Sequence, residues 1–595
     1  MPNEQILEKA RFPRPDFIRR DFISLDGEWE FSFCSQLEHP FPEGYQDRPL
    51  PGKILVPFSY TCNASGIGHE IYEDCVCYAR DLIVQENKLS GEALLKFGAA
   101  DYCCDVWIND TYAGSHQGGH TQFEFPVASY LHPGKNRIFL RVRDDRTCDR
   151  PRGKQYWKDT PDRCWYPDTI GIWKSVWLEF VPKKYIKRVK LTPDTDNRCL
   201  KLEAYLNESF SGTLKADIFF HDTLKKTAAF SLTDTHYICE SLHIAEEDFV
   251  DEVHYWSCEK PNLYHLSLFL SEANTLEDDT EEYNTVIGDS VECYFGMRKI
   301  ETREGKVFLN NRLLFQRLVL DQGYWKDSLM TPPSKDALKQ DIHLTKMMGF
   351  NGARKHQKLE DPFYYYWADV TGLLVWCEMP SPYQFNDCEI SSFLSEWQEI
   401  ICEAYNHPCI ITWVPFNESW GIRNVFKDQQ QQNLLAAAYH LTKAYDPTRL
   451  ISTNDGWEVP DETDIFCIHD YEGDADTLRQ RYQDIGAFSR TGIPNRPALT
   501  QPSVYRSQPF FLSEYGGVAL LCDSSEENWG YNEFAETFEE YVQRVKALTE
   551  TAGNLPGCCG YCYTQLTDVF QEVNGLLTAK REPKVPFEML KKIFI

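Results

Sequence analysis

The sequence predicts a multidomain protein that combines β and α/β architecture, with two β-sandwiches followed by a C-terminal (β/α)₈ TIM barrel. The chain has 595 residues, which is more than a single hydrophobic core usually supports, so we expect about three domains. Short apolar runs separated by turn residues fill the first half and are typical of sandwich strands. From residue 298 onward, helical spacing alternates with apolar strands, which is the pattern of a barrel of about 250 residues.

The first sandwich is expected to end at residue 182 and the second at residue 297. The strand-like runs of the first part are SLDGEWEFSF, LLKFGAADYCCDVWIND, NRIFLRVRDD and GIWKSVWLEFVP. Their length and their spacing indicate an all-β sandwich. The second part contains KRVKLTPD, LKADIFF and HLSLFL without any helical period, and it is again the size of a sandwich. The expected domains are therefore residues 1–182, 183–297 and 298–595.

Three helix–strand pairs mark the first part of the barrel segment. SKDALKQDIHLTKMMGF precedes NGARKH, DPFYYYWADVTG precedes LLVWCEMP, and FLSEWQEIICEAYNHP precedes CIITWVPFNES. Strands that are apolar on both faces are typical of a parallel sheet covered by helices. In a parallel barrel the C-terminal strand ends meet on one face, and active sites lie there.

Composition and charge narrow the class of protein. The formal net charge is −29 and no basic run is present, so we expect no nucleic-acid partner. No stretch approaches about 20 uninterrupted apolar residues, so we expect no membrane span. The N-terminal residues lack the apolar core of a signal peptide, which makes the cytoplasm the expected location. The 21 cysteines are then expected to be reduced, buried and free of disulfides.

No cofactor and no metal site are predicted. Cys558, Cys559 and Cys562 form a cluster, but no second pair with zinc spacing accompanies them, so we do not favour a metal there. No glycine-rich loop opens a helix to hold phosphate, and no serine lies in a nucleophile elbow. The sequence leaves the oligomeric state open, a homo-oligomer included.

Polar residues gather at the predicted strand ends of the barrel. ITWVPFNESWG places Glu418 after a buried strand, and PFFLSEYGG places Glu514 in the same way. The polar residues at these ends are Asp321, Arg354, His356, Glu378, Asn417, Glu418, Asn454, Asp455, His469, Tyr471, Glu514 and Gln565. Paired carboxylates without a metal or cofactor point to glycoside hydrolysis, in which one carboxyl group protonates the leaving oxygen and the other attacks or activates water.

Over nearly its whole length the chain resembles glycoside hydrolase family 2, the group of β-galactosidases, β-glucuronidases and β-mannosidases. LLKFGAADYCCDVWINDTYAGSHQGGHTQFEF resembles the family's N-terminal sugar-binding jelly roll, and TIGIWKSVWLE resembles its last strand. GFNGARKHQ resembles the barrel entry motif, while FNESWG and LSEYGG resemble the acid/base and nucleophile motifs. The resemblance implies a jelly-roll β-sandwich, an immunoglobulin-like β-sandwich and a catalytic TIM barrel, and it makes a carbohydrate the expected substrate.

The resemblance also assigns roles. It implies a retaining mechanism with Glu418 as general acid/base and Glu514 as nucleophile, their carboxyl groups about 5–5.5 Å apart. It places Tyr471 and Arg354 against the nucleophile, and it places Asn417 at the sugar 2-hydroxyl. The alternative for each glutamate taken singly is a capped or salt-bridged loop carboxylate.

The residue chemistry fits the two roles. A general acid must hold its proton near neutral pH, and a hydrophobic strand end beside Trp420 is expected to raise the pKa of Glu418 by desolvation. A nucleophile must stay ionised, which requires hydrogen-bond donors close to Glu514.

Other candidates for sugar contacts are less specific. His356 stands where the family usually has Ser-His-Tyr-Pro, but the sequence here is RKHQK, and a structural histidine is the alternative. Asp321, His469 and Asp470 lie at strand ends and are expected to bind sugar hydroxyls. Trp165 lies in the jelly-roll loop that can lean over the barrel mouth, and it is expected to stack on a sugar unless it is a buried sandwich residue.

The expected substrate is a terminal, β-linked neutral hexose, a galactoside first, removed by exo attack. The glucuronidase branch binds the sugar carboxylate with an Asn-x-Lys motif, whereas this chain has Glu572-Val573-Asn574, and an acid there should repel a uronate. Gln565 follows Thr564, which stands where the family has a tryptophan platform, so the subsite departs from the family pattern. The alternatives are a β-glucuronidase or another family 2 β-glycosidase and, in a different class, a catalytically silent carbohydrate-binding protein.

Overall fold

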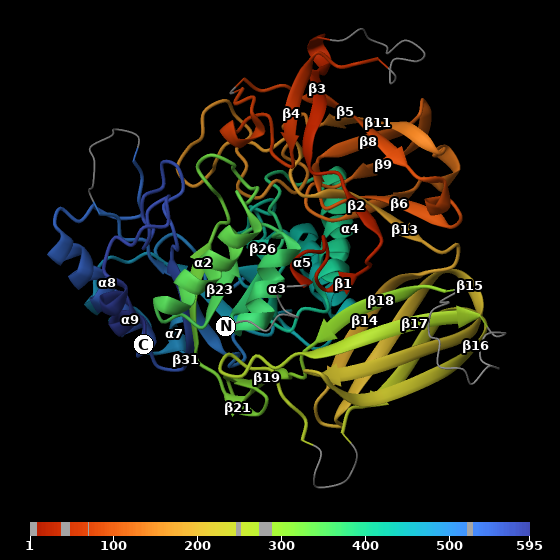
Figure 1. Cartoon of the computed structure of the whole chain (residues 1–595). Helices are drawn as coiled ribbons and strands as arrows, with labels where there is room; N and C mark the ends of the chain where they lie inside the picture. The colour runs from red at the N-terminus through yellow and green to blue at the C-terminus, as the bar shows by residue number, and fades with distance from the viewer. Residues whose placement is uncertain (1–8, 37–47, 70, 246–251, 273–287, 521–527) are drawn as a thin grey trace.

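The computed structural model describes residues 9–36, 48–69, 71–245, 252–272, 288–520 and 528–595. Within these residues the chain forms two β-sandwiches and a (β/α)₈ barrel, so the predicted fold class is confirmed. Figure 1 shows the N-terminal sandwich in red and orange above the second sandwich in yellow, with both against the barrel in green and blue. No described helix is long and apolar enough to cross a membrane.

The N-terminal sandwich packs a six-stranded sheet against a four-stranded one. Its core is built from residues such as Trp29 and Phe97, which are fully buried. The larger sheet has the order β4 (Gly52–Val56), β3 (Gly27–Phe33), β5 (Cys75–Val84), β11 (Gly134–Arg143), β8 (Cys103–Ile108) and β9 (Thr111–Gln117). The smaller sheet has the order β10 (Phe123–Pro126), β6 (Glu92–Phe97), β13 (Val176–Val181) and β2 (Phe22–Ser24), and β7 (Ala100–Asp101) pairs separately with β12 (Gly171–Ile172).

The second sandwich is one six-stranded sheet that folds on itself around two long strands. The first half of β15 (Cys199–Phe220) pairs with β14 (Ile186–Asp194), and its second half pairs with β17 (Tyr264–Glu272). A register irregularity between Tyr205 and Gly212 separates the halves. A β-bulge of this kind bends a strand, so it lets one strand serve two layers. The remaining strands are β16 (Thr223–His243), β18 (Ser290–Phe295) and β1 (Phe17–Ile18).

The barrel is a parallel eight-stranded sheet. Its strands are short and buried along almost their whole length, which suits a sheet covered by helices. In sheet order they are β27 (Leu450–Ile451), β25 (Ile410–Val414), β24 (Leu374–Glu378), β23 (Gly352–Lys355), β22 (Gln316–Asp321), β31 (Cys558–Thr564), β30 (Phe510–Gly516) and β29 (Phe466–Asp470). A separate parallel pair, β26 (Phe416–Asn417) and β28 (Asn454–Asp455), extends the strand ends on one side. Ahead of the barrel lies a three-stranded sheet of β19 (Ile300–Arg303), β20 (Lys306–Leu309) and β21 (Arg312–Leu313).

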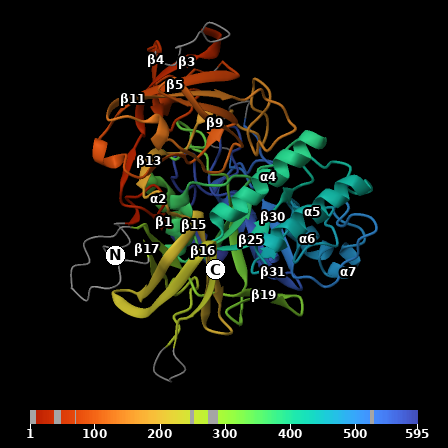
Figure 2. The same ribbon diagram turned by 90° about the vertical axis from the view of Figure 1, so that its right-hand side faces the viewer.

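Helices cover the outside of the barrel, and local sequence signals fix their ends. The Ser334 side chain accepts the Ala337 N–H at the start of α2 (Lys335–Met347), and Asp361 with Pro362 opens α3 (Pro362–Thr371). Figure 2 shows α4 and α5 side by side on the outer face. The other helices are α4 (Asp387–Ala404), α5 (Gln429–Tyr445), α6 (Ala475–Arg481), α7 (Ile485–Phe488), α8 (Phe538–Gly553) and α9 (Phe587–Phe594).

The N-terminal sandwich and the barrel share a buried interface. A cluster of buried apolar residues from both parts fills it, with Tyr166 and Trp173 from the sandwich against Tyr324 and Met330 from the barrel segment. The backbone N–H groups of Arg152 and Gly153 both donate to Ser381 O at 3.1 Å. The sandwich loop that contains these residues is therefore held against the barrel strand ends.

The prediction that all cysteines are reduced is wrong for one pair. Cys34 and Cys75 form a disulfide in the N-terminal sandwich. Strand pairing between β3 and β5 brings their Cα atoms to 5.2 Å, within the range that a disulfide spans, although 41 positions separate them in the sequence. The thiols of Cys558 and Cys559 donate to backbone carbonyls of Gly560 and Gly305.

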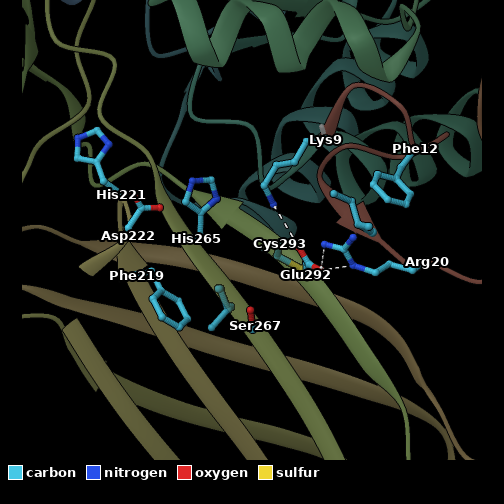
Figure 3. Close-up of a pocket in the computed structure, with 12 residues that line it drawn as sticks. Lys9, Phe12, Arg20, Phe219, His221, Asp222, His265, Ser267, Glu292 and Cys293 are labelled. Carbon is cyan, nitrogen blue, oxygen red and sulfur yellow. Dashed lines mark hydrogen bonds and ion pairs between the residues drawn. The ribbon is translucent and has the colours of Figure 1, made fainter. Parts of the chain in front are cut away.

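A buried ion pair attaches the N-terminal segment to the second sandwich. Arg19 Nη2 lies 2.7 Å from Asp289 Oδ2, and both side chains are buried. The neighbouring pair of Arg20 and Glu292 is more exposed and lies at the rim of a hollow between this segment and the sheet (Figure 3).

We expect Asp289→Ala to destabilise the protein by about 3 kcal/mol, because it leaves a buried guanidinium without its main partner. Glu292→Ala is the matched control and should cost roughly 0–1 kcal/mol, since exposed ion pairs contribute little. Urea denaturation followed by tryptophan fluorescence measures both. Equal shifts of the two midpoints would show that Arg19 does not depend on Asp289.

Candidate active site

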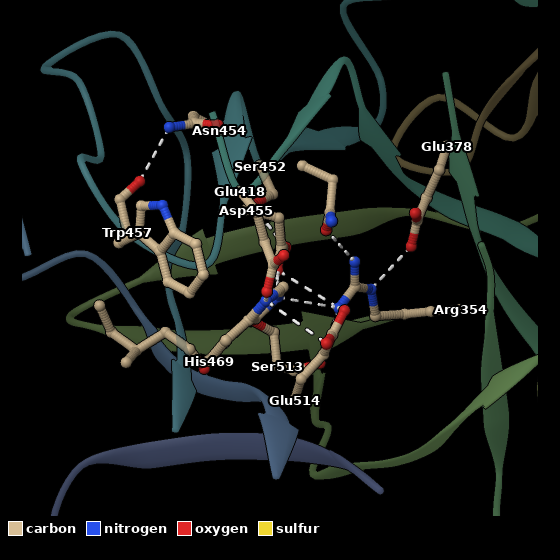
Figure 4. A network of polar contacts seen from close by, with 12 residues as sticks. Arg354, Glu378, Glu418, Ser452, Asn454, Asp455, Trp457, His469, Ser513 and Glu514 are labelled. Atoms are coloured by element: carbon tan, nitrogen blue, oxygen red, sulfur yellow. Dashed lines mark hydrogen bonds and ion pairs between the residues drawn. The ribbon is translucent and has the colours of Figure 1, made fainter. Parts of the chain in front are cut away.

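The polar residues predicted at the strand ends converge on one face of the barrel. Arg354 comes from β23, Glu378 from β24, and Glu514 from β30, while Asn417 and Asp455 come from the short pair of β26 and β28. Figure 4 shows the side chains of Arg354, Glu378, Asp455 and Glu514 pointing toward one another across the strand ends. All five side chains are at least nine-tenths buried. The geometry of a parallel barrel is what brings together residues that are up to 160 positions apart.

Arg354 is the central cation of the site. Its Nε donates to Glu378 Oε1 at 2.8 Å, Nη1 donates to Glu514 Oε1 at 3.0 Å, and Nη2 donates to Asn417 Oδ1 at 3.1 Å. Nη1 also lies 3.3 Å from Asp455 Oδ1. Burial would lower the pKa of Arg354, but Asp455, Glu378 and Glu514 hold it well above its usual value. One guanidinium thus orients an amide and three carboxylates.

Glu514 receives two donors on its two oxygens, as the sequence predicted. Arg354 holds Oε1, and the Tyr471 hydroxyl donates to Oε2. The Tyr471 ring stacks on Tyr531 with 3.5 Å between ring centroids, which fixes the hydroxyl. Burial and the charge of Glu514 raise the pKa of Tyr471 well above its usual value, so the phenol keeps its proton. A carboxylate held in this way is positioned to attack as an anion.

Glu418 lies in a turn that directs its side chain toward Glu514 and His469. Glu418 and Ser419 have φ angles of 53° and 55°, in the left-handed region that non-glycine residues rarely adopt. The Glu418 N–H donates to Asp455 O at 2.8 Å, and the Ser419 N–H donates to Asn454 Oδ1 at 3.1 Å. The Glu418 side chain is 18% exposed against 3% for Glu514, so it is the carboxyl group that an incoming aglycone can reach.

The two glutamates face each other across a short gap. One carboxylate oxygen of Glu418, one of Glu514 and a ring nitrogen of His469 all lie within 4.8 Å of one another. Carboxyl groups about 5–5.5 Å apart suit direct attack on a sugar, whereas about 6.5–9.5 Å leaves room for an intervening water.

The structure places His469 between the two glutamates. Its Nδ1 lies 2.9 Å from Glu418 Oε1 and 3.4 Å from Glu514 Oε2, while Nε2 lies 2.6 Å from Asp455 Oδ1. Burial lowers the pKa of His469, but these three carboxylates outweigh burial and raise it to about 9. A Cβ at Gly456 would lie 2.9 Å from Nδ1, so only glycine leaves room for the ring.

The expected rise in the pKa of Glu418 is wrong for the free site. Burial does raise this pKa, but the hydrogen bond and the charge of His469 outweigh burial and lower it below its usual value. Trp420 follows in the next turn, yet a charged imidazole rather than an apolar wall decides the ionisation of Glu418. The sequence places His469 at a strand end but does not show which carboxylates it meets.

His356 and Asn417 lie beside the carboxylate pair. His356 Nδ1 is 2.7 Å from Glu378 Oε2, and Glu378 also holds Arg354, so Glu378 connects two site residues. The oxygen of the Asn417 amide accepts from Arg354, which leaves its NH₂ group as the donor available for a sugar hydroxyl.

Two predicted sugar contacts are occupied by protein groups instead. Asp321 accepts from Lys355 Nζ at 2.9 Å and from the Gly323 N–H at 2.9 Å. The Asp470 carboxylate is bound by Arg481 and by the Tyr482 hydroxyl. Successive side chains of a strand point to opposite faces, so Asp470 faces the helices if His469 faces the site.

Gln565 and Glu572 belong to one buried network. Gln565 Nε2 donates to Asn574 Oδ1 at 2.7 Å, and Asn574 Nδ2 donates to Glu572 Oε1 at 3.1 Å. Glu572 Oε2 accepts from the Tyr166 hydroxyl at 2.6 Å, which links the network to the N-terminal sandwich. Burial raises the pKa of Glu572. Glu572 is thus a fixed internal acid rather than a solvated loop residue.

Trp165 contributes to an aromatic wall at the barrel mouth. Its Nε1 donates to the Tyr383 hydroxyl at 2.9 Å, and its ring meets Trp420 edge to face with centroids 5.2 Å apart. Because Trp420 lies two residues after Glu418, this wall stands next to the more exposed carboxyl group. An aromatic surface there suits an aglycone or a sugar face.

Sequence reasoning missed Lys154. Lys154 lies in the sandwich loop that contacts the barrel. Its neighbour Gly153 packs against Gln357 O of the barrel segment. The side chain is 6% exposed, and its ammonium has no hydrogen-bond or ion-pair partner within the described ranges. Burial lowers the pKa of Lys154, but nearby acidic groups, including Cys164, Glu572 and Glu418, raise it above its usual value. No motif marks this residue, since its role depends on how two domains pack.

Comparisons with known proteins agree with this architecture. A β-galactosidase from Photobacterium profundum is 24% identical to this chain over an alignment that covers 76% of this chain and 44% of the relative. This chain therefore matches less than half of that relative's length. Two solved structures share its fold: a β-glucuronidase from an uncultured Clostridium species (TM-score 0.77, 17% identity, 97% of this chain and 98% of that chain) and a β-galacturonidase from Eisenbergiella tayi (TM-score 0.74, 19% identity, 97% of each chain).

Three family models match consecutive parts of the sequence. The sugar-binding domain of glycosyl hydrolases family 2 matches residues 22–182, a model described as glycosyl hydrolases family 2 matches residues 184–298, and the family's TIM barrel domain matches residues 300–595. These matches cover nearly every residue from 22 to the last, and the chain therefore belongs to glycosyl hydrolase family 2.

Proposed function

We propose that the protein is a retaining β-glycosidase that removes a terminal β-linked hexose by double displacement. The observation that carries this proposal is the facing pair of Glu418 and Glu514, whose nearest oxygens lie within 4.8 Å. Each carboxyl group has the surroundings that its role requires. Glu514 is buried and held by two donors, whereas Glu418 is the more exposed and lies beside the aromatic wall.

In the first step a Glu514 oxygen attacks the anomeric carbon while Glu418 protonates the departing glycosidic oxygen. In the second step Glu418 takes a proton from water, whose oxygen displaces Glu514. Charge develops on the ring oxygen and anomeric carbon in both steps, and the Asn417 NH₂ group can donate to the 2-hydroxyl as it does. Arg354 and Tyr471 keep Glu514 in the attacking orientation throughout.

The sugar is a neutral hexose as first choice, with an acidic hexose as the second candidate. Glu572 favours the neutral sugar because it is an acid at the position where glucuronidases have a carboxylate-binding motif. Lys154 favours the second candidate, since it is a buried ammonium without a direct partner among the residues that the structure describes. It lies close enough to Glu572 and Glu418 for their charges to act on it.

We expect Glu514→Ala to lose hydrolysis of an aryl β-glycoside by several orders of magnitude, because no nucleophile remains. In the parent protein the first sugar released should be the β anomer, which ¹H NMR detects before mutarotation. An α anomer as first product would mean that water attacks directly and would remove the nucleophile role from Glu514.

Glu418→Ala should lose about 10²–10⁴-fold in kcat/KM on phenyl glycosides but far less on dinitrophenyl glycosides, which leave without protonation. Azide should restore turnover of the activated substrate and yield a β-glycosyl azide, since it needs no general base. Steady-state kinetics with and without azide test this. If both leaving groups suffer equally, the acid/base role lies elsewhere.

The parent protein should prefer p-nitrophenyl β-galactoside to the β-glucuronide. Lys154→Met should lower kcat/KM for the glucuronide by about 10-fold or more, since losing one charge–charge contact of about 1.4 kcal/mol has that effect. The galactoside should change little. Lys158→Met, in the same loop but exposed, is the matched control. A glucuronide preference in the parent would make the acidic sugar the substrate and leave the two glutamates in place.

A further inference from the structure

His469 contacts the acid/base glutamate with one ring nitrogen and Asp455 with the other. Nδ1 faces Glu418 Oε1 at 2.9 Å, and Nε2 faces Asp455 Oδ1 at 2.6 Å. Asp455 is itself held by the hydroxyls of Ser513 at 2.7 Å and Ser452 at 2.8 Å (Figure 4). Asp455, His469 and Glu418 thus form a continuous line that ends at the leaving-group side of the site.

The geometry of this line sets the protonation of the ring. Ionised carboxylates only accept hydrogen bonds, so Nδ1, which faces Glu418, and Nε2, which faces Asp455, must each carry a hydrogen. Arg354 Nη1 lies 3.2 Å from the same Nε2, but the 2.6 Å contact with Asp455 is the shorter and makes Nε2 a donor. His469 is therefore an imidazolium in the free site.

We propose that the acid proton of the reaction rests on His469 and reaches the leaving group through Glu418, so that His469 is a positioning residue and proton reserve for the acid/base glutamate. This inference rests on the proposed retaining glycosidase reaction. It explains why Glu418 has a lowered pKa in the free site although the reaction requires a proton donor there.

The proton transfers balance over the two steps of the reaction. As the glycosidic C–O bond breaks, the Nδ1–H proton passes to Glu418 and from Glu418 to the departing oxygen, while Glu514 forms the bond to the anomeric carbon. In the second step water adds to that carbon and the bond to Glu514 breaks. The water proton passes to Glu418 and Nδ1 is protonated again. The balance is one glycoside and one water converted into a sugar and an alcohol.

Among the described residues, carboxylates and a guanidinium contact the ring and influence its ionisation. Three carboxylates, Glu418, Glu514 and Asp455, stabilise the imidazolium, and one cation, Arg354 on β23, opposes it. These contacts describe the free site, whose ionisation is what the pH dependence of kcat/KM reports. The pair of His469 and Glu418 should therefore lose its proton near the pKa of His469, which is about 9.

The test compares the pH dependence of kcat/KM in the parent, His469→Asn and Asp455→Asn. The parent should lose activity only as pH rises toward about 9. His469→Asn leaves the proton on a carboxyl group alone, and Asp455→Asn removes a carboxylate that stabilises the imidazolium. The alkaline limb of both variants should therefore move down by about one pH unit or more. His469→Asn should also lose about 100-fold on phenyl glycosides and much less on dinitrophenyl glycosides.

His407→Asn is the matched control, because it removes a buried histidine whose Nδ1 lies 2.6 Å from Asp369, away from the two glutamates. It should leave the alkaline limb where it is in the parent. An unmoved limb in both His469→Asn and Asp455→Asn would overturn the proposal. So would a ¹⁵N spectrum of the parent at pH 7 that shows every imidazole of this site singly protonated. Failure of the glycosidase proposal is separate, since it would show as no turnover by the parent.

Discussion

The site is organised by one fully buried guanidinium. Arg354 is 0% exposed, and it contacts Glu378, Asn417, Asp455 and Glu514 at 2.8 to 3.3 Å. Taking a charge out of water is costly unless it is paired and hydrogen-bonded. The burial of Arg354 therefore requires these partners, and the burial of their carboxylates requires Arg354. With this cation between them, the carboxylates at the strand ends can lie close together.

How far the sequence predicts the site follows from what a strand pattern contains. Buried apolar runs that end in Asn417-Glu418 and in Glu514 predict both the barrel and the face on which the polar residues meet. The same pattern cannot give the register at a strand end, so His469 and Asp470 looked equivalent although only His469 faces the glutamates. The ionisation of the site residues is even harder to predict from the sequence, because the pKa of Glu418 depends on His469, which is 51 positions away.

Contacts between domains are the second feature that the sequence pattern could not predict. Lys154 and Tyr166 lie in the N-terminal sandwich, yet Tyr166 binds Glu572 of the barrel and Lys154 approaches the same acid. A local motif describes one segment, whereas the charge of this corner depends on how a loop from one domain packs on another. The Cys34–Cys75 disulfide was missed for a related reason, since strand pairing and not sequence spacing brings the two thiols together.

Charge balance connects these observations. Three carboxylates around the ring of His469 would repel one another strongly in a buried site, by roughly 4 kcal/mol for each pair about 4 Å apart at an effective dielectric of 20. Arg354 neutralises part of this charge permanently, and the imidazolium neutralises another part with a proton that can move. A fixed cation therefore suits the nucleophile, which must remain an anion until it attacks. A titratable cation suits the acid/base glutamate, which must change its protonation state twice in each turnover. Accordingly, Arg354 binds Glu514, and the ring of His469 lies closer to Glu418 than to Glu514.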